Sequence, residues 1–511
     1  MLSKVLSAAH FGLETVPIEV EVSVSKKGFP GFSIIGLPSK AIEESKERVK
    51  TALANSGVEF PQAKIIVNLA PADLPKEGSN YDFPIAIGIL HALESVTLPR
   101  EKSFFYGELS LDGTLRHTKG VFLLAFSAKK YNVKNLFVPK DSANEAAVIR
   151  SVSTYPLKSL EEAIFHLNGR GNIRPLIATR EKQMEANDTV EFDFAEIVGQ
   201  SQAKRALEIA AAGGHNLYMQ GPPGSGKTML ARALSGVLPP LSEDESLEVT
   251  KIYSLTGNIP PGGSLIYTRP FRASHHTTSR IGLIGGGSNP HPGEISLAHN
   301  GVLFLDEFPE FSRSTLEALR QPLEDGRVSI TRAAGSMEFP AHFMLVAAAN
   351  PCPCGYLGDE KRECKCSPRA IMCYQAKLSG PLMDRIDLHV TVPAVEIEKL
   401  IPSTKTLKKR EPSEAIRRRV NAARLRQQKR FEGRGIHVNA GMKNKHVNEL
   451  VDMDGKVLVL LKQAVNTYNL SARTYFRLIK VAQTISDLEG SSRVLPGHVA
   501  EALQYRIRVE S

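Results

Sequence analysis

Hydrophobic and polar residues alternate through residues 16–24, so that the apolar side chains share one face, and this pattern predicts a β-strand. Residues 36–57 instead place apolar side chains at helical spacing, and a glycine ends the predicted helix. Further strands are predicted in residues 63–71 and 103–113. These elements indicate a mixed α/β domain over residues 1–167.

The rest of the chain divides into three predicted segments. Residues 168–189 are polar and without periodicity, which is typical of a linker. Strands and helices between residues 190 and 395 indicate a second α/β domain, and residues 396–511 contain helical patterns only. No apolar run approaches the ~18 residues that a membrane span requires, so we expect no membrane partner.

A phosphate-binding loop follows the apolar strand at residues 217–219 and precedes a predicted helix. Its glycines let backbone N–H groups close around a β-phosphate, and the positive end of the helix adds to the attraction. Lys227 is expected to reach the β- and γ-phosphates of ATP, and Thr228 to bind Mg²⁺. The loop consists of Gly221, Pro222, Pro223, Gly224, Ser225, Gly226, Lys227 and Thr228.

Polar side chains follow two further apolar strands. Asp306 and Glu307 end the run "GVLFLDE", where Asp306 would hold Mg²⁺ and Glu307 would polarise the attacking water. Asn350 ends "FMLVAAAN" and can hydrogen-bond that water or the γ-phosphate. The sequence therefore predicts a nucleotide hydrolase.

Two arginines outside these strands are candidate phosphate ligands. Arg385 precedes another strand and is either a finger donated to a neighbouring subunit or the partner of Asp384 or Asp387 in a salt bridge. Arg473 begins a C-terminal helix, from which it could close over the phosphates as part of a lid.

All five cysteines lie within residues 350–373. Two C-x-C pairs separated by nine residues can supply four thiolates to a tetrahedral Zn²⁺. We predict a zinc site at Cys352, Cys354, Cys364 and Cys366, with Cys373 as an alternative ligand. We expect a cytoplasmic location, because the N-terminal stretch is interpreted as the first strands of a domain, and thiols that stay reduced there indicate a metal site rather than disulfides.

The formal net charge is +10, which is compatible with a nucleic-acid partner. Residues 405–434 contain twelve basic and three acidic residues. Either this run is a solvated helix face, or Arg417, Arg418 and Arg419 contact DNA.

The order of these motifs resembles an AAA+ ATPase of the magnesium-chelatase-like group, and within it the ComM/YifB competence family. The segments that carry this resemblance are "FDFAEIVGQ", "RPFRASHHTTS", "LIGGGSNPHPGEISLAHNGVLFLDE", "NPCPCG" and "LSGPLMDRIDLHV". The family has an AAA+ core with a parallel sheet and a C-terminal helical lid. The resemblance implies that this chain has them too, with a zinc loop at residues 350–373 inside the core.

The same resemblance implies roles for individual residues. Asp306 and Glu307 correspond to the Walker B pair, Asn350 to sensor 1, Arg385 to the arginine finger and Arg473 to sensor 2. Three residues are expected near the adenine, namely Val198, Gly199 and Gln200. Polar contacts in an insertion loop are expected for His275 and His276, rather than metal binding.

Residues 1–167 resemble the Lon-protease type of α/β fold. The stretches "PKEGSNYDFPIAIGIL" and "GELSLDGTLRHTKGVFLL" match the surroundings of that family's serine and lysine, but Asn80 and Phe122 stand at the two positions. Ser79 and Lys119 lie nearby, and their side chains are displaced from the dyad register. We expect a structural or ligand-binding domain without proteolysis.

The resemblance implies a ring, expected to be a hexamer, that binds single-stranded and branched DNA and drives branch migration in recombination during natural transformation. Recombination proteins are possible partners. A protein remodeller and a chelatase-type subunit are the alternative functions. A glycine-rich insertion in place of an aromatic pore loop disfavours the remodeller, and the lack of a recognisable porphyrin site disfavours the chelatase subunit.

Overall fold

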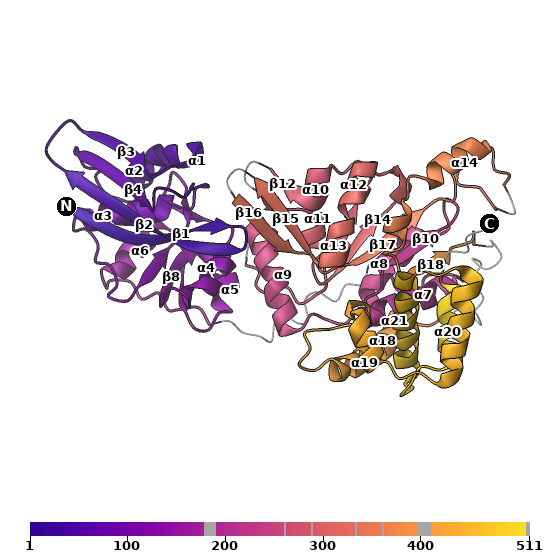
Figure 1. Ribbon diagram of the computed structural model, residues 1–511. Coiled ribbons are helices and arrows are strands. Elements are labelled where there is room, and N and C mark those ends of the chain that lie inside the picture. Colours follow the sequence, from indigo (N-terminus) through magenta and orange to yellow (C-terminus); the bar gives the residue numbers. More distant parts are fainter. Residues whose placement is uncertain are drawn as a thin grey trace. The chain divides into compact units, whose positions relative to one another are not determined.

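The structure is a computed structural model, and it describes residues 1–177, 191–259, 262–287, 290–332, 335–359, 362–395 and 410–506. It contains two compact units, shown with their elements in Figure 1. The first comprises Met1–Asn187 and Ser242–Tyr267, and the second comprises Asp188–Leu241 and Thr268–Ser511.

The N-terminal unit is built on a seven-stranded mixed sheet of order β3-β4-β2-β1-β5-β8-β9. The predicted alternation is confirmed in β2, where Ile18, Val20 and Val22 are fully buried while their neighbours are partly exposed. The strands are β1 (Leu2–Phe11), β2 (Glu14–Ser25), β3 (Gly31–Ile35), β4 (Lys64–Ala70), β5 (Ser103–Phe105), β8 (Asn135–Pro139) and β9 (Ser153–Leu157), with the small pair β6 (Glu108–Leu109) and β7 (Leu115–Arg116).

Helices complete this unit. They are α1 (Lys40–Glu43), α2 (Ser45–Asn55), α3 (Asp82–Ala92), α4 (Val121–Ala128), α5 (Lys140–Ala147), α6 (Leu160–Leu167) and α9 (Glu243–Thr256). Helix α3 is hydrophobic all round and almost wholly buried, since it packs on β1 and β2.

Helix α9 belongs to the N-terminal unit although it follows the phosphate loop in sequence. The Ser254 hydroxyl donates to the Glu145 carboxylate at 2.6 Å, and the Ser254 carbonyl accepts from the Gly120 N–H at 2.9 Å. Lys251 lies over the ring of Phe126, 3.6 Å from its centroid. The sequence pattern assigns this segment to residues 190–395, whereas its packing partners lie in α4 and α5.

The residues at the two Lon-type dyad positions are both buried. Phe122 is fully buried, and its backbone N–H donates to Glu145 at 3.2 Å. Asn80 is buried, and the neighbouring Ser79 hydroxyl donates to Glu108. A carboxylate partner does not activate a serine in the way that a desolvated lysine does.

The second unit contains a five-stranded sheet of order β11-β14-β17-β10-β18, in which every neighbouring pair is parallel. This confirms the predicted parallel core. The strands are β10 (Leu217–Gln220), β11 (Phe271–Ser274), β14 (Val302–Leu305), β17 (Met344–Ala349) and β18 (Leu388–Thr391). Two short antiparallel pairs accompany the sheet, β12 (Gly285–Gly286) with β13 (His291–Pro292) and β15 (Arg327–Arg332) with β16 (Gly335–Pro340).

The helices of this unit fall into two sets. Those within the sheet region are α7 (Ser201–Gly213), α8 (Lys227–Ala233), η1 (Leu234–Val237), α10 (Arg280–Ile284), α11 (Glu294–Leu297), η2 (Phe308–Glu310), α12 (Arg313–Ala318), α13 (Arg320–Asp325), α14 (Pro368–Gln375) and α15 (Gly380–Met383). The C-terminal set is α18 (Ser413–Arg430), η3 (Asn439–Gly441), α19 (Asn444–Leu450), α20 (Gly455–Tyr468), α21 (Ala472–Glu489) and α22 (Pro496–Gln504).

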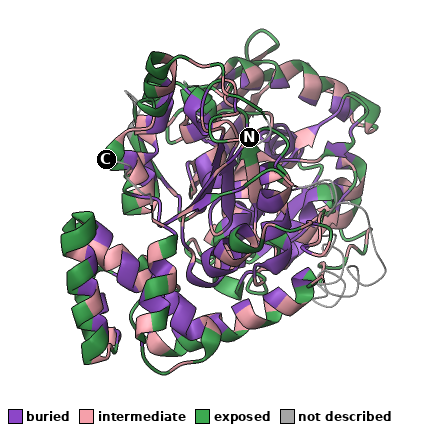
Figure 2. Ribbon diagram, turned by 90° about the vertical axis from the view of Figure 1, so that its right-hand side faces the viewer, coloured by how far each residue is buried: buried purple, intermediate pink, exposed green. Residues whose placement is uncertain are grey.

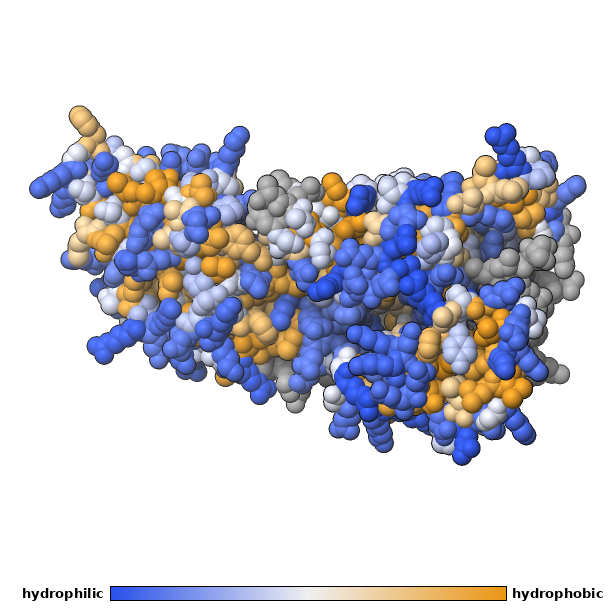
Figure 3. Space-filling view, viewed as in Figure 1, coloured by the Kyte–Doolittle hydropathy of each residue, from blue (hydrophilic) through white to orange (hydrophobic). Residues whose placement is uncertain are grey.

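One hydrophobic core joins the parallel sheet to the C-terminal helices. It includes Val346 of β17, Leu207 of α7, Val420 of α18 and Ile485 of α21. Figure 2 shows these helices with buried inner and exposed outer faces. On α20 the outer face is partly apolar, with Leu458, Val459 and Tyr468 exposed (Figure 3). None of the helices in the described ranges has the length and hydropathy needed to cross a membrane.

Candidate active site

The phosphate loop joins β10 to α8 and depends on glycine at two kinds of position. Gly224 and Gly226 have φ values of 75° and 89°, a left-handed conformation that side chains disfavour. At Gly221 a Cβ atom would lie 2.1 Å from the carbonyl oxygen of Val392, so only glycine fits against β18. The loop is thereby held at the carboxyl end of β10.

Lys227 and Thr228 connect the loop to the neighbouring strands. The Lys227 ammonium donates to the carbonyls of Gly221 at 2.7 Å and Pro222 at 2.8 Å, and to the Asn350 side-chain oxygen at 3.3 Å. Burial lowers the pKa of Lys227 from its usual value. The Thr228 hydroxyl donates to Asp306 at 2.8 Å. Residues more than 120 positions apart, Lys227 and Asn350, thus share one polar cluster with the expected Mg²⁺ ligands.

The segment expected near the adenine contacts the same loop. Gln200 adopts φ 56° and donates from its side chain to the carbonyl of Pro393 at 2.7 Å and of Ser225 at 3.4 Å. Val198 and Gly199 precede it, and they are half-buried and exposed respectively.

Glu307 has a contact that the sequence pattern did not predict. Its carboxylate lies 2.8 Å from Nδ1 of His276, and both side chains are partly exposed. The contact arises because β11 and β14 are parallel neighbours with Ser274 opposite Leu305, so the residues that follow each strand emerge side by side. The contact between His276 and Glu307 could have been predicted from the sequence only by inferring that β11 pairs with β14.

His276 is therefore a polar neighbour of the predicted water-activating carboxylate and not only an insertion-loop residue. Its ring also packs against that of His275, with centroids 4.0 Å apart. Ligand atoms of His275, His276 and Glu307 lie within 4.8 Å of one another, a spacing at which a metal ion could be held.

The two candidate arginines meet at one carboxylate, that of Glu324. Arg385 is buried and donates to Glu324 and to the carbonyl of Pro381, while Arg473 donates to the other oxygen of Glu324 at 3.2 Å. Arg385 lowers the pKa of Glu324. The sequence offered Asp384 or Asp387 as the salt-bridge partner of Arg385. In the structure the partner is instead Glu324, a carboxylate of α13.

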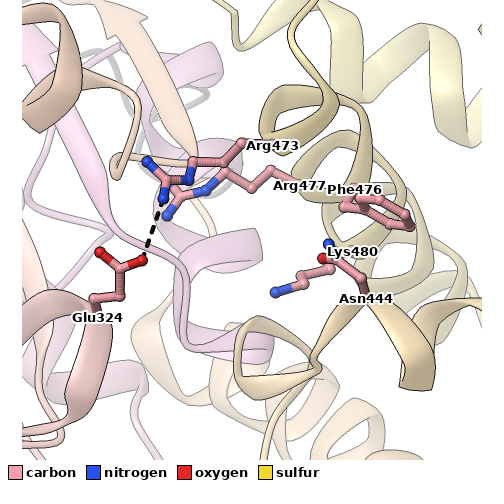
Figure 4. Close-up of a pocket in the computed structure, with 6 residues that line it drawn as sticks. All are labelled: Glu324, Asn444, Arg473, Phe476, Arg477 and Lys480. Carbon is pink, nitrogen blue, oxygen red and sulfur yellow. Dashed lines mark hydrogen bonds and ion pairs between the residues drawn. The ribbon is translucent and has the colours of Figure 1, made fainter.

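Glu324 and Arg473 face a cavity of about 310 Å³ (Figure 4). Three cationic side chains of α21 line it, together with Asn444 and Phe476; they are Arg473, Arg477 and Lys480. Arg477 is neutralised by Asp387 at 3.0 Å. The candidate residues therefore fall into two groups by their contacts, one around Lys227 and one around Glu324.

The predicted zinc ligands come together as a group. The sulfur atom of Cys352 lies 3.4 Å from that of Cys354 and 3.7 Å from that of Cys364, and the Cys354 N–H donates to the sulfur of Cys366 at 3.4 Å. Four sulfurs around a tetrahedral zinc would be about 3.8 Å apart. Hydrogen bonding from the backbone of Tyr356 lowers the pKa of Cys354, whereas burial and the neighbouring thiols raise the pKa values of Cys364 and Cys366 against the effect of their backbone hydrogen bonds.

This cysteine group fits a zinc ion in number, chemistry and spacing. Cys373, the alternative ligand, is exposed on α14 and lies outside the group. Residues 360 and 361 of the predicted zinc loop lie outside the described residues.

The basic run is largely engaged within the chain where the structure describes it. On α18, Arg419 pairs with Glu208 and Glu411, and Arg418 pairs with Glu414 at 2.6 Å. Arg424 donates to a carbonyl of α7, and Arg430 pairs with Asp487 of α21. Most of these charges pack the helix in place, and residues 405–409 lie outside the described ranges.

A phosphate loop at the end of a parallel sheet, with an acidic strand end and a polar sensor beside it, defines a P-loop ATPase. Family models agree. Residues 193–400 match "Magnesium chelatase, subunit ChlI", residues 20–142 match "Subunit ChlI of Mg-chelatase", and residues 410–506 match "Magnesium chelatase, subunit ChlI C-terminal".

The chain belongs to the ComM/YifB family of magnesium-chelatase-like AAA+ ATPases, as the resemblance predicts. It is 43% identical over 516 residues to competence protein ComM of Haemophilus influenzae, covering 99% of this chain and 98% of that protein. It is 42% identical to the uncharacterized protein YifB of Escherichia coli, covering 99% and 97%. A shorter match, 28% identical over 181 residues, joins 31% of this chain to 33% of Lon protease 2 of Bacillus subtilis.

We expect His276→Ala to lower the turnover number for ATP about tenfold and to leave ATP affinity unchanged, because the Glu307 carboxylate loses the imidazole nitrogen that lies 2.8 Å from it. His276→Asn, which keeps a donor, should recover part of the rate. Steady-state hydrolysis and separate measurement of ATP binding check this. The matched control is His275→Ala, whose ring contacts Thr277. Equal losses in both variants would show that the two rings act together, as metal ligands would.

Proposed function

We propose that the chain assembles into a ring, expected to contain six subunits, in which ATP hydrolysis moves branch points in DNA. The main support for a ring is that Arg385 and Arg473 both pair with Glu324. Neither arginine pairs with a residue of the group around Lys227. A γ-phosphate needs such a cation in the transition state. A neighbouring subunit is the source that would complete the site.

In this arrangement each ATP is bound by Lys227 and Thr228 of one subunit. Thr228 would supply its hydroxyl to Mg²⁺, and Asp306, which accepts a hydrogen bond from that hydroxyl, would hold the ion through water. Glu307 would polarise the attacking water, and Asn350 would orient that water or the γ-phosphate. Arg385, and Arg473 with it, reach that phosphate from the adjacent subunit. Glu324 keeps both guanidinium groups paired until a more highly charged phosphate displaces it.

DNA as the substrate rests on family membership and on the overall charge of +10. The relative from Haemophilus influenzae is named a competence protein, which supports a role in natural transformation. Recombination proteins are the partners that we propose for that role. A protein remodeller or a chelatase-type subunit would need the same ATP site but no DNA. Salt-sensitive DNA binding therefore separates the candidates.

We expect Lys227→Ala and Arg385→Ala proteins to be inactive alone but to regain part of the ATPase activity when they are mixed. Mixed rings rebuild complete sites, because the Arg385→Ala subunit keeps its own Lys227 and its neighbour keeps Arg385. Hydrolysis measured across mixing ratios checks this, and Glu307→Gln should bind ATP and assemble but barely hydrolyse.

The matched control for mixing is Lys227→Ala with Glu307→Gln. Both changes damage the half-site that one subunit supplies, so no mixture of them contains a complete site. Activity in this control, or none in the first mixture, would contradict donation of Arg385 between subunits.

We also propose that the four-cysteine group holds one zinc ion in a reducing, cytoplasmic setting. Elemental analysis of protein purified without chelator should give about one zinc per chain. Cys364→Ser should lose the metal, because three thiolates and a hydroxyl bind zinc more weakly. Cys373→Ser is the matched control and should retain the metal, since this exposed thiol lies outside the group. Metal-free wild-type protein with normal activity would rule the site out.

For DNA, the double variant Arg417→Gln with Arg418→Gln should weaken binding uniformly across sequences. The slope of its salt dependence should fall by about one for each arginine that no longer neutralises a phosphate. Titrations at several salt concentrations measure both effects. Arg116→Gln, at an arginine of the N-terminal unit that is exposed as Arg418 is, is the charge control.

Arg419→Gln should behave differently from the double variant, since it leaves the buried Glu208 without one of its cationic partners and should lower the melting temperature. Wild-type protein that neither binds DNA at low salt nor moves a branched junction with ATP would remove DNA from the proposal. Protein remodelling would then take precedence.

A further inference from the structure

The cysteine group is continuous with the ATP site along the chain. Strand β17 ends at Ala349, and the next residue, Asn350, accepts a hydrogen bond from Lys227 at 3.3 Å. Cys352 and Cys354 follow within four residues, and Cys352 is fully buried. Any displacement of these two thiols is therefore transmitted to Asn350 over a very short span of backbone.

The cysteine group also touches the ATP site through space. Gly355 donates its N–H to the carbonyl of Cys352 at 3.0 Å and adopts φ 85°. A Cβ atom at this position would lie 2.5 Å from Cδ of Pro223 and 3.8 Å from Cγ of Asn350. The backbone at Gly355 consequently packs against the ring of Pro223, which is part of the phosphate loop.

These two connections meet at the groups that must be placed accurately for phosphate binding. The N–H groups around Pro223 have to converge on the β-phosphate, and Asn350 has to face the γ-phosphate or the attacking water. The segment from 351 to 367 is polar apart from a few side chains, so it has little hydrophobic surface with which to fold by itself. Four thiolates around one metal ion would supply the missing stabilisation.

We propose that the cysteine loop, in its described residues 351–359 and 362–367, is a positioning element of the ATP site that holds the phosphate loop at Pro223 and the sensor Asn350 through the close packing of Gly355. This proposal rests on the proposed ATPase mechanism. It adds to that mechanism the residues of the cysteine loop, which act without touching the nucleotide. The zinc ion, where bound, acts through this contact by keeping the loop folded.

The test uses two glycines of this same loop in the full-length protein. Gly355 and Gly358 both have left-handed backbones, with φ of 85° and 76°, so alanine strains either one similarly. An added methyl at Gly358 meets nothing within 4 Å, whereas at Gly355 it collides with Pro223. The difference between Gly355→Ala and Gly358→Ala therefore isolates the contact from the backbone strain.

We expect Gly355→Ala to lower ATP affinity, turnover or both by about tenfold or more relative to Gly358→Ala. Its zinc content should stay equal to that of wild type, because all four cysteines remain. ATP binding, steady-state hydrolysis and elemental analysis are measured on both variants, with circular dichroism to confirm folding. A zinc-selective chelator should reduce wild-type turnover, and added zinc should restore it.

Equal activity in the two alanine variants would overturn the proposal. Loss of zinc from Gly355→Ala with no loss from Gly358→Ala would also overturn it, since the defect would then come from the metal site and not from the packing against Pro223. A selective defect of Gly355→Ala in a protein that carries no zinc would support the packing contact while refuting the proposed metal. ATP binding remains a valid readout even if wild-type hydrolysis proves absent, which separates failure of this inference from failure of the proposed function.

Discussion

The active site depends on one constraint, that adjacent parallel strands end at the same edge of a sheet. Strands β11, β14, β17 and β10 are consecutive neighbours in the five-stranded sheet. His275, Asp306 and Asn350 directly follow β11, β14 and β17, and the phosphate loop follows β10. The contacts of Lys227 with Asn350 and of Thr228 with Asp306 result. The Asp306 and Glu307 carboxylates at this edge stay partly exposed, whereas the Lys227 ammonium is buried and is stabilised by the carbonyls and the Asn350 oxygen to which it donates. The sheet therefore brings together groups that lie far apart in the sequence.

Ion pairs within the subunit determine which arginine and lysine side chains remain available to bind phosphate or DNA. Glu324 holds Arg385 and Arg473 together, and Asp387 neutralises Arg477 beside them. The arginines of α18 are similarly engaged with Glu208, Glu411 and Asp487. A count of basic residues therefore overstates the charge available to DNA. The residues with the strongest claim on a phosphate are those whose partner is a single, partly exposed carboxylate such as Glu324.

The N-terminal unit contains a buried carboxyl group that connects two helices. Glu145 is almost completely buried, and burial raises its pKa to about 7 even though Ser254 and the Phe122 N–H stabilise its charge. This carboxyl group joins α5 to α9, a helix that lies between the phosphate loop and β11 in sequence. Sequence order alone would assign α9 to the ATPase core. Its polar contacts and the packing of Lys251 on Phe126 place it with α4 and α5 instead.

The sequence by itself determined the features that are local in the chain. The phosphate loop, the acidic pair at Asp306 and Glu307, and the two cysteine pairs are each contiguous motifs, so their chemistry can be recognised before any folding is known. The parallel core was predictable for the same reason, since buried strands alternate with helices. Only the tertiary structure decided which distant groups meet. The pairing of His276 with Glu307 needs β11 beside β14, the pairing of Arg385 with Glu324 joins residues 61 positions apart, and the contact of Gly355 with Pro223 joins two loops. Such contacts depend on how elements pack in space, and that packing leaves no periodicity or spacing in the sequence from which it could be inferred.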